Sequence, residues 1–521
     1  MKKYFFLHPI FFSLYPAIFL YSQNINQYKE NVLLIPILLS LAFLGLISSV
    51  CWLVIRKLEI SAVASSLLIL IFFSYSRVKE LAKSIKLTSD ILLSICLLVI
   101  FIFLIFLVFR YQKYLHNISR ALSILSVILI IMVLSNNAFF EVQIKRLSLL
   151  NLESGSIPEE NSEIAGQKPD IYYFVLDRYA GAEVLKQYGF DNNPFLDFLK
   201  SKGFYIASEA TSNYPKTFLS LGSTLNMEYL NFLTEKTNGG ATSDESIVTP
   251  LVQNGKVIQL LKSKGYSYIH VGSGWDPTRS NPKASQNFVL KGGRYPFADE
   301  FTSGFLQTTL ASPILTKLYP DPTAVSEKPK NNEERSRILY EFEVFNQIIN
   351  QGGPKFVFTH ILIPHDPYVL GKDCEPLPET VTSKSGEKEN YLNQLQCANK
   401  KMEEVLTKIL ASSSVKPVIL IQADEGPLPI LNPISKNLAW KNASDQSLKE
   451  KFPILTAYLL PGNKNNVLYP AITPVNSFRL IFNTYFGTNL PLLPDRNIIF
   501  EDDKNYYKFI DVTEKLKTNT N

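Results

Sequence analysis

The segment "PVILIQADEGPLP", residues 417–429, places two adjacent carboxylates at the end of an apolar run. Val418 to Ile421 read as a buried strand, and Asp424 and Glu425 follow it closely. Neighbouring carboxylates repel each other, and each loses hydration if the end of the strand is enclosed. Either both acids are solvated in a surface loop, or a cation lies beside them.

The second half of the chain alternates short apolar segments with longer helical patterns. The predicted strands are 171–176, 267–272, 356–362, 418–423 and 454–460. The predicted helices include 331–350, 388–411 and 475–485. Apolar strands separated by helices are typical of an α/β domain with a mainly parallel sheet between helices. Ligands of such sheets bind beyond the carboxyl ends of the strands.

Polar residues gather where several of these predicted strands end. Asp177 follows the first strand in "VLDRYAG", and His360 and His365 belong to "FTHILIPHDPY" at the third. Asp424 and Glu425 follow the fourth. A single Asp after a strand is usually a helix cap, and a single His is usually a packed or surface residue. Their recurrence at one edge of one sheet instead predicts a shared anionic site.

The segment "TSNYPKTFLSLGSTLNMEYL" (211–230) contains the candidate nucleophile. Pro215 suits the first turn of a helix that would run through Leu230. Thr217 would then lie where unpaired backbone N–H groups and the helix dipole attract a phosphate. A divalent cation would activate its hydroxyl. The alternative is that Thr217 is only a residue suited to the start of a helix.

Long apolar segments fill the N-terminal part of the chain. They cover 5–22, 32–55, 59–76, 90–110 and 120–138. Most reach the ~20 residues that cross a bilayer, which predicts a membrane domain of about five helices over 1–140. A linker over 141–169, an α/β domain over 170–510 and a polar tail over 511–521 follow.

Charge and cysteine content narrow the class of protein further. The net charge is +6, and no dense Lys/Arg tract indicates nucleic-acid binding. Basic residues are divided evenly between the two sides of the predicted membrane domain, so charge alone leaves its orientation open. Cys374 and Cys397 are the two cysteines beyond that domain. They form either a disulfide, which requires an oxidising compartment, or two free thiols.

Five segments together resemble the sulfatase-like branch of the alkaline phosphatase superfamily. They are "PDIYYFVLDRYAG" (169–181), "SNYPKTFLSL" (212–221), "HILIPHDPY" (360–368), "VILIQADEGP" (418–427) and "KFPILTAYLLPG" (451–462). Lipoteichoic acid synthases and lipid A phosphoethanolamine transferases are the most similar in architecture. These membrane-anchored phosphotransferases place five membrane helices before an extracytoplasmic catalytic domain. The resemblance implies the same arrangement here, in the cytoplasmic (inner) membrane.

The resemblance also implies roles for individual residues. Asp177 and Asp424 would be metal ligands, and Thr217 would be the metal-bound nucleophile that takes up the phosphoryl group. His360 and His365 would contact the substrate phosphate or protonate the leaving group. In "HVGSGWDPTR" (270–279), Trp275 resembles a head-group contact and Arg279 would pair with phosphate.

Glu425 departs from the pattern, because relatives usually carry His in an Asp-His-Gly sequence. As a ligand, its carboxylate would favour Mn²⁺ or Mg²⁺, with Ca²⁺ or Zn²⁺ as further candidates. True sulfatases carry a Cys or Ser that becomes formylglycine within C/S-x-P-x-R, and "TFLSL" (217–221) lacks this sequence. Sulfate-ester hydrolysis is therefore disfavoured.

Three functions agree with these observations. The first is a metal-dependent phosphotransferase that moves a phospholipid head-group phosphoryl unit onto an envelope glycan or lipid through phospho-Thr217. The second is a phosphodiesterase of the same fold with water as the acceptor. The third is a non-catalytic sulfatase-like membrane protein, which the Glu425 departure would favour. A transporter is disfavoured because the predicted spans carry almost no charge.

Overall fold

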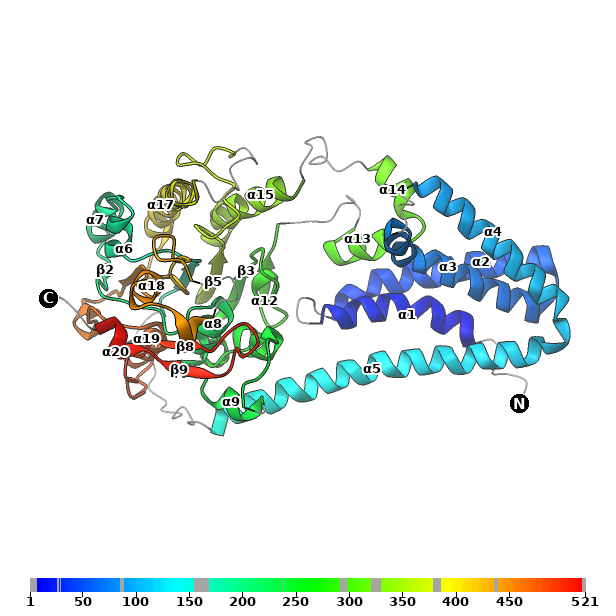
Figure 1. Cartoon of the computed structure of the whole chain (residues 1–521), viewed down its shortest axis with the longest axis horizontal. Helices are drawn as coiled ribbons and strands as arrows, with labels where there is room; N and C mark the ends of the chain where they lie inside the picture. The colour runs from blue at the N-terminus through cyan, green and yellow to red at the C-terminus, as the bar shows by residue number, and fades with distance from the viewer. Residues whose placement is uncertain are drawn as a thin grey trace. The chain divides into compact units, whose positions relative to one another are not determined.

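The computed structural model divides into two compact units, and each is described by itself (Figure 1). The first combines Met1–Ile144 with Lys291–Glu327, and the second combines Lys145–Leu290 with Lys328–Asn521. The structure describes residues 7–25, 28, 30–84, 89–153, 168–237, 239–290, 298–319, 329–377, 386–434 and 439–517.

The N-terminal unit is built from long apolar helices. They are α1 (Leu7–Gln23), α2 (Leu34–Ile55), α3 (Leu58–Ser84), α4 (Asp90–Arg110) and α5 (Leu115–Glu153). Among the described residues, four segments are long and apolar enough to cross a membrane: Glu30–Ile55, Leu58–Ser84, Asp90–Arg110 and Gln112–Phe139.

The first and third predicted spans differ from the structure in length. The first forms α1, a helix of 17 residues that contains Pro16 and is shorter than the other four. The third, predicted over 59–76, is part of a helix of 27 residues, because polar residues continue the helix beyond the apolar segment. The predicted linker begins inside α5, which continues to Glu153, and its remaining part over 154–167 lies outside the described residues.

A segment predicted to belong to the α/β domain packs with the N-terminal helices instead. It contains α13 (Glu300–Gln307) and α14 (Ser312–Leu318), and we call residues 298–319 the insert. The Phe301 ring lies 6.4 Å from that of Tyr21. The Leu310 N–H donates to the carbonyl of Phe72 over 2.8 Å. The predicted domain over 170–510 includes this segment. Its two helices are too short to give a sequence pattern that distinguishes them from the rest of the domain.

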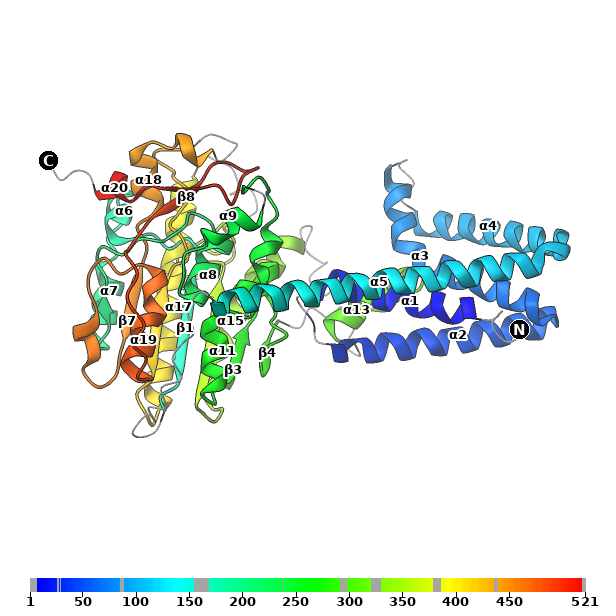
Figure 2. The same ribbon diagram turned by 90° about the horizontal axis from the view of Figure 1, so that it is seen from below.

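The second unit centres on a seven-stranded sheet among the described residues, in the order β2-β7-β6-β1-β5-β3-β4. Figure 2 labels β7, β1, β3 and β4 of this sheet. The strands are β1 (Ile171–Leu176), β2 (Tyr205–Ile206), β3 (Ser267–Val271), β4 (Gln286–Phe288), β5 (Lys355–Ile361), β6 (Val418–Gln422) and β7 (Thr456–Leu459). The five strands from β6 to β4 are parallel, whereas β7 is antiparallel to both β6 and β2. The prediction of an α/β fold with a mainly parallel sheet is confirmed.

Helices cover both faces of this sheet because the side chains of β1 alternate between the faces. Tyr173 meets Phe478 of α19 edge to face, with ring centres 5.2 Å apart. Its neighbour Phe174 packs on Phe345 of α16 at 5.0 Å. The helices are α6 (Ala182–Gln187), α7 (Asn193–Ser201), α8 (Thr217–Asn226), α9 (Phe232–Lys236), α10 (Thr249–Gln253), α11 (Lys256–Ser263), α12 (Asp276–Arg279), α15 (Pro329–Glu343), α16 (Phe345–Ile348), α17 (Glu387–Ser412), α18 (Asp445–Lys451), α19 (Pro474–Tyr485) and α20 (Thr513–Lys517).

The C-terminal segment is more ordered than the predicted polar tail. Strand β9 (Phe509–Asp511) pairs antiparallel with β8 (Ile498–Phe500), and α20 follows. Val512 is buried between them, which gives this polar segment an apolar attachment. The last part of the predicted tail, 518–521, lies outside the described residues.

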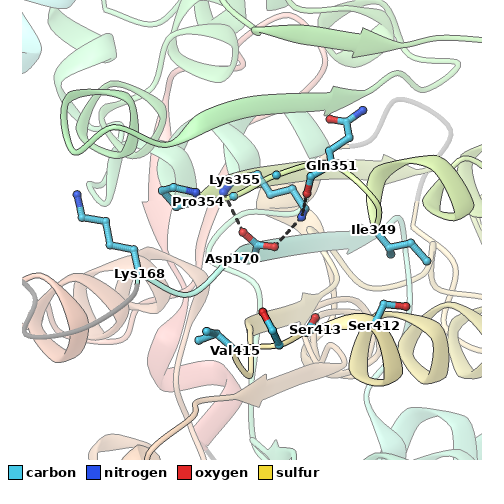
Figure 3. Close-up of a pocket in the computed structure, with 12 residues that line it drawn as sticks. Lys168, Asp170, Ile349, Gln351, Pro354, Lys355, Ser412, Ser413 and Val415 are labelled. Carbon is cyan, nitrogen blue, oxygen red and sulfur yellow. Dashed lines mark hydrogen bonds and ion pairs between the residues drawn. The ribbon is translucent and has the colours of Figure 1, made fainter.

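The amino ends of the central strands are tied together by one acidic residue, in a polar cavity of about 410 Å³ (Figure 3). Asp170 accepts from the Lys355 N–H over 3.0 Å and from its ammonium over 2.7 Å. That ammonium also donates to the carbonyl of Gln351 over 2.8 Å. The buried Lys355 ammonium is thus paired with the partly exposed Asp170 carboxylate, which indicates a structural role for this edge of the sheet.

A disulfide joins Cys374 to Cys397, whose Cα atoms lie 5.0 Å apart. Cys397 is on α17, and Cys374 lies in the connection that follows β5. The other two cysteines, Cys51 and Cys96, are free and belong to α2 and α4.

We expect the Cys374→Ser/Cys397→Ser double variant to lower the free energy of unfolding of the second unit by about 3 kcal/mol, because the closed loop spans roughly 20 residues. Chemical denaturation of the full chain in detergent measures this change. The Cys51→Ser variant is the control and should leave the transition of the second unit in place. An unchanged transition in the double variant would contradict a stabilising disulfide.

Candidate functional site

Three buried side chains converge at the carboxyl ends of the central strands. Strand β1 pairs with β5 on one side and β6 on the other, so Asp177, His360 and Asp424 are brought to the same edge. One potential ligand atom from each lies within 4.8 Å of the other two. This is the shared site that the strand ends predict, with His360 as its third member.

The cluster has the properties of a cation site. Asp177 Oδ1, Asp424 Oδ2 and His360 Nε2 are buried and make no hydrogen bond within the described residues. Buried polar atoms in proteins are nearly always satisfied, so this many orphaned acceptors at one point require an explanation. Two carboxylates and an imidazole are common ligands of divalent metals. A divalent cation therefore fits these residues.

The pKa values of Asp177 and Asp424 are shifted in opposite directions. Burial raises the pKa of Asp177, but the charges of His365, His360 and Arg178 outweigh it and hold the pKa well below its ordinary value. Burial, followed by repulsion from Asp177 and Glu425, raises the pKa of Asp424 well above its ordinary value. A shared cation would remove the repulsion that opposes ionisation of Asp424.

The orientation of His360 differs from the role predicted for it. Its Nδ1 lies 2.9 Å from the Thr278 hydroxyl, which directs Nε2 to within 3.4 Å of Asp177 Oδ2. The Trp275 ring stands edge-on to the imidazole at 5.7 Å. His360 is thus placed among the ligand candidates rather than at the wall where a leaving group would lie.

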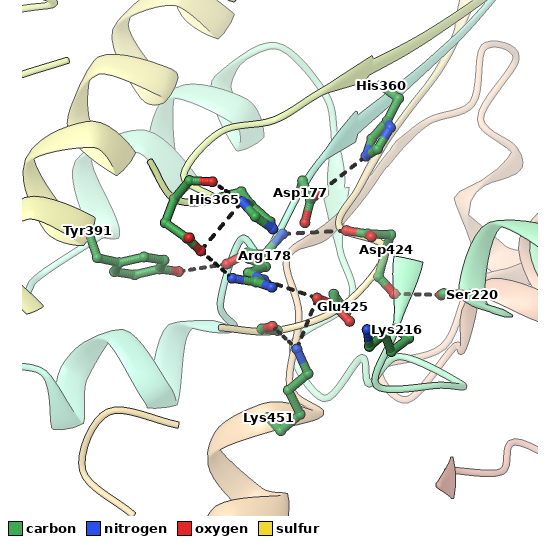
Figure 4. A network of polar contacts seen from close by, with 12 residues as sticks. Asp177, Arg178, Lys216, Ser220, His360, His365, Tyr391, Asp424, Glu425 and Lys451 are labelled. Atoms are coloured by element: carbon green, nitrogen blue, oxygen red, sulfur yellow. Dashed lines mark hydrogen bonds and ion pairs between the residues drawn. The ribbon is translucent and has the colours of Figure 1, made fainter. Parts of the chain in front are cut away.

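Glu425 is held by two side-chain cations (Figure 4). Its Oε1 lies 3.1 Å from Arg178 Nε and 3.2 Å from the ammonium of Lys451. Glu425 and Lys451 are 3% and 0% exposed, so this pair is removed from water. Glu425 is not a member of the three-residue cluster. Protein cations thus engage Oε1, whereas the buried Oε2 makes no hydrogen bond among the described residues, so the predicted role of Glu425 as a metal ligand stays a prediction.

Arg178 connects this ion pair to the cluster. Its main chain adopts the left-handed conformation, with φ of 63°, and its N–H points to Asp424 Oδ1 at 3.4 Å. Tyr391 holds the turn by donating to the Arg178 carbonyl over 2.8 Å. The guanidinium also binds Asp366 over 2.5 Å. The strained turn directly after Asp177 thus aims both the main chain and the side chain of Arg178 at the site.

The approach of β6 to α18 depends on Gly426. A Cβ on this residue would lie 2.1 Å from the carbonyl oxygen of Lys451. The Lys451 ammonium in turn donates to the Gly426 carbonyl over 2.7 Å. Only glycine permits this approach, which brings the cation to Glu425.

Thr217 is the first residue of α8, and Lys216 precedes it as the cap. The helix begins two residues later than predicted, which leaves Pro215 outside it, and ends at Asn226 because Met227 adopts the left-handed conformation. Thr217 lies close enough to Asp424 to lower the pKa of that carboxyl, against the larger effect of burial. Ser220, one turn along, donates to the Asp424 main-chain carbonyl over 2.5 Å. The helix start is therefore bound to the end of β6.

The cluster opens into a cavity of about 270 Å³. Of the predicted residues, Asp177, Thr217, Trp275, His365 and Glu425 line it. Arg279 does not: its guanidinium pairs with Asp276 over 2.8 Å, one turn earlier on α12. Its predicted pairing with phosphate stays a prediction.

Several cavity residues were missed by the sequence analysis. Lys216 and Glu245 face each other at 3.5 Å on the wall, and Glu334 of α15 lies nearby. Arg178 and Lys216 are adjacent to Asp177 and Thr217, so proximity in sequence is a signal that could have identified them. Glu245, Glu334 and Lys451 carry no such signal, because tertiary packing alone brings them to the site.

Comparisons with known proteins identify distant structural neighbours. The chain matches no protein-family model and no curated protein. The C-terminal periplasmic domain of EcEptC from Escherichia coli is similar at 12% identity and a TM-score of 0.41, over 67% of this chain and 93% of that chain. The corresponding domain of phosphoethanolamine transferase EptC from Campylobacter jejuni is similar at 11% identity and a TM-score of 0.40, over 63% and 92%.

A 2-O GAG sulfatase is similar at 16% identity and a TM-score of 0.40, over 62% of this chain and 72% of that chain. The chain thus resembles periplasmic transferase domains and sulfatases. At these identities and scores the likeness carries no argument about activity, which is argued below from the residues of the site.

We expect Lys451→Met to destabilise the second unit by about 3 kcal/mol, because it leaves the buried Glu425 carboxylate with one cation fewer. The Glu425→Gln/Lys451→Met double variant should lose less than the sum of the two single variants. Chemical denaturation of all three gives the coupling energy. Lys464→Met, at an exposed lysine, is the control, and an equal effect of both lysine variants would contradict the buried pair.

The Mn²⁺ affinities of two variants distinguish the role of Asp424 from that of Glu425, its neighbour in sequence. We expect Asp424→Asn to weaken Mn²⁺ binding by about 100-fold or more and Glu425→Gln by less than about tenfold, because only Asp424 belongs to the cluster. Isothermal titration of the full chain with Mn²⁺ measures both. An equal loss of Mn²⁺ affinity in these two isosteric variants would indicate that Glu425 is also a metal ligand.

Proposed function

We propose that this protein is a membrane-anchored, metal-dependent phosphotransferase that moves a phospholipid head-group phosphoryl unit onto an envelope glycan or lipid. The observation that carries the proposal is the position of Thr217. It begins a helix of ten residues and lines the cavity, and Ser220, one turn along this helix, binds the main chain of Asp424. A hydroxyl at a helix N-terminus beside a cation site is suited to attack a phosphate.

Asp177, Asp424 and His360 would hold the metal ion, with Thr217 beside it. When bound, a divalent cation supplies charge neutralisation for the phosphate and lowers the pKa of a nearby hydroxyl. The two carboxylates favour Mn²⁺ or Mg²⁺, and the imidazole of His360 adds Zn²⁺ to the candidates.

Residues of the chain provide the remaining parts of a phosphoryl transfer. Thr217 Oγ forms a bond to phosphorus while the bond to the lipid glycerol oxygen breaks, and the hydroxyl proton passes to solvent. His365, on the cavity wall, gives a proton to the departing oxygen. Lys216 is the cation that we assign to a non-bridging phosphate oxygen, because it lies next to Thr217 on the same wall.

The second half of the reaction restores the site. The hydroxyl of a glycan or lipid acceptor attacks phospho-Thr217 and gives its proton to His365, and Thr217 regains a proton as it leaves. Water in place of the acceptor gives hydrolysis through the same intermediate. Trp275, which lines the cavity, is the residue that we assign to the part of the head group beyond the phosphate.

The membrane and the disulfide support the placement of this reaction. Four helices that are able to span a bilayer would keep the domain on a membrane that contains its phospholipid donor. The Cys374–Cys397 disulfide favours an oxidising, extracytoplasmic compartment for the second unit. We therefore assign the chain to the inner membrane as a multi-pass protein, with its catalytic domain outside the cytoplasm.

We expect incubation with a phospholipid carrying a radiolabelled head-group phosphate, in the presence of Mn²⁺, to label the peptide that contains Thr217. Mass spectrometry of that peptide identifies the transferred group. Thr217→Ala should abolish labelling, and Thr217→Ser should retain part of it because it keeps a hydroxyl at the same position. Ser223→Ala, in the same helix with its hydroxyl bonded to the Glu228 carbonyl, is the control.

Labelling that persists in Thr217→Ala, or that maps to another peptide, would overturn Thr217 as the nucleophile. Adding a glycan acceptor then separates the two reactions. Movement of label onto the acceptor indicates transfer, whereas release of the head-group phosphate to water alone indicates hydrolysis.

A further inference from the structure

The N-terminal unit contains an apolar cavity of about 480 Å³ that the proposed reaction does not use. Its walls come from α1, α3 and α5, and Thr308 of the insert closes part of it. The lining is mainly aromatic and aliphatic and includes Tyr15, Phe19, Phe73 and Leu129. We call this cavity the helix groove.

The helix groove exists because α5 meets α1 at two separated polar contacts. Near the start of α1, His8 Nε2 lies 3.0 Å from the Ser119 hydroxyl of α5. Near its end, the Asn136 amide donates to the Ser22 hydroxyl over 3.1 Å. Tyr15 and Phe19 of α1 lie between these two points, as does Leu129 of α5. The two contacts hold the helices together while the segment between them stays open.

The insert fixes the wall that α3 contributes. The Ser76 N–H donates to the Thr308 carbonyl over 3.2 Å, and the Leu310 N–H donates to the Phe72 carbonyl over 2.8 Å. Phe305 also packs on Phe73, with ring centres 5.5 Å apart. Main-chain bonds at two points hold the insert in a defined position against α3.

Arg77 lies at the rim of the helix groove and is only weakly paired. Arg77 and Glu80 line the helix groove, are 76% and 65% exposed, and approach each other only to 3.7 Å. Lys79 is different, because it binds Asp90 over 2.5 Å. An exposed pair at that distance is worth little, so Arg77 can exchange Glu80 for a phosphate. Its guanidinium matches a phosphodiester geometrically.

We propose that the helix groove is a binding site for one glycerophospholipid, with an acyl chain between α1, α3 and α5 and the phosphate at Arg77. Within a bilayer, an apolar cavity is filled by lipid hydrocarbon rather than water. Basic side chains at the ends of membrane helices bind lipid phosphates. The insert distinguishes this site from the general lipid surface, because it adds a fixed wall to the cavity. The inference concerns binding and does not rest on the proposed catalysis.

Native mass spectrometry tests the proposal on the full chain. The protein is reconstituted in nanodiscs of equal parts phosphatidylethanolamine and phosphatidylglycerol, and the lipid retained after release is counted. The unchanged chain should retain one phospholipid. Ser74→Phe, which places a ring in the helix groove, should remove it. Gly45→Phe is the matched control, because a side chain at this position of α2 would enter open space.

Arg77→Ala should reduce the retained lipid about tenfold, as expected for loss of one charge-assisted contact. Arg56→Ala, at the far end of α2, controls for loss of a basic residue. Thr217→Ala, which the proposed function makes inactive, should retain the lipid, so a failure of catalysis and a failure of binding are distinguishable. Equal retention in Ser74→Phe and Gly45→Phe, or no retained lipid in the unchanged chain, would overturn the site.

Discussion

The end of β6 carries the constraint on which the site depends, because two carboxylates of adjacent residues are both buried there. The structure separates them. Glu425 turns toward Arg178 and Lys451, which compensate its charge from within the protein. Asp424 turns toward Asp177 and His360, where its buried Oδ2 has no hydrogen-bond donor among the described residues. The two adjacent carboxylates are therefore accommodated in different ways, Glu425 by protein cations and Asp424 in the three-residue cluster.

This division explains how a glutamate is accommodated directly after Asp424. A neutral imidazole needs no partner cation, whereas a buried carboxylate does. The chain supplies that cation from α18, through the close approach at Gly426. The buried Glu425 carboxylate is thus matched by a cation of the same chain, which argues against a site that has lost its function. A site that had lost its function would not be expected to retain buried ligand atoms of Asp177, His360 and Asp424 that have no hydrogen-bond partner among the described residues.

The sequence was sufficient for features that depend on local pattern. Apolar segments predict the five main strands to within a few residues. Recurring polar residues at their ends predict a shared site of Asp177, His360, His365, Asp424 and Glu425, of which the structure clusters Asp177, His360 and Asp424. The sequence was insufficient where tertiary contacts decide. Lys451 reads as an ordinary helical lysine until α18 packs beside β6. The insert reads as part of the α/β domain, because nothing in its short helices indicates that its main chain bonds to α3.

The charges of the site give an independent argument for a divalent cation. The carboxylates of Asp177, Asp424 and Glu425 are buried, and Asp366 shares Arg178 with them at the cavity wall. Among the described lysines and arginines, Arg178 and Lys451 are the two that form ion pairs with this group. Four acidic side chains, three of them buried, thus share these two cations. Uncompensated negative charge in a buried site is costly unless a counter-ion balances it. A divalent cation would offset this charge, and a bound phosphate would then bring its own charge to Lys216, the lysine next to Thr217.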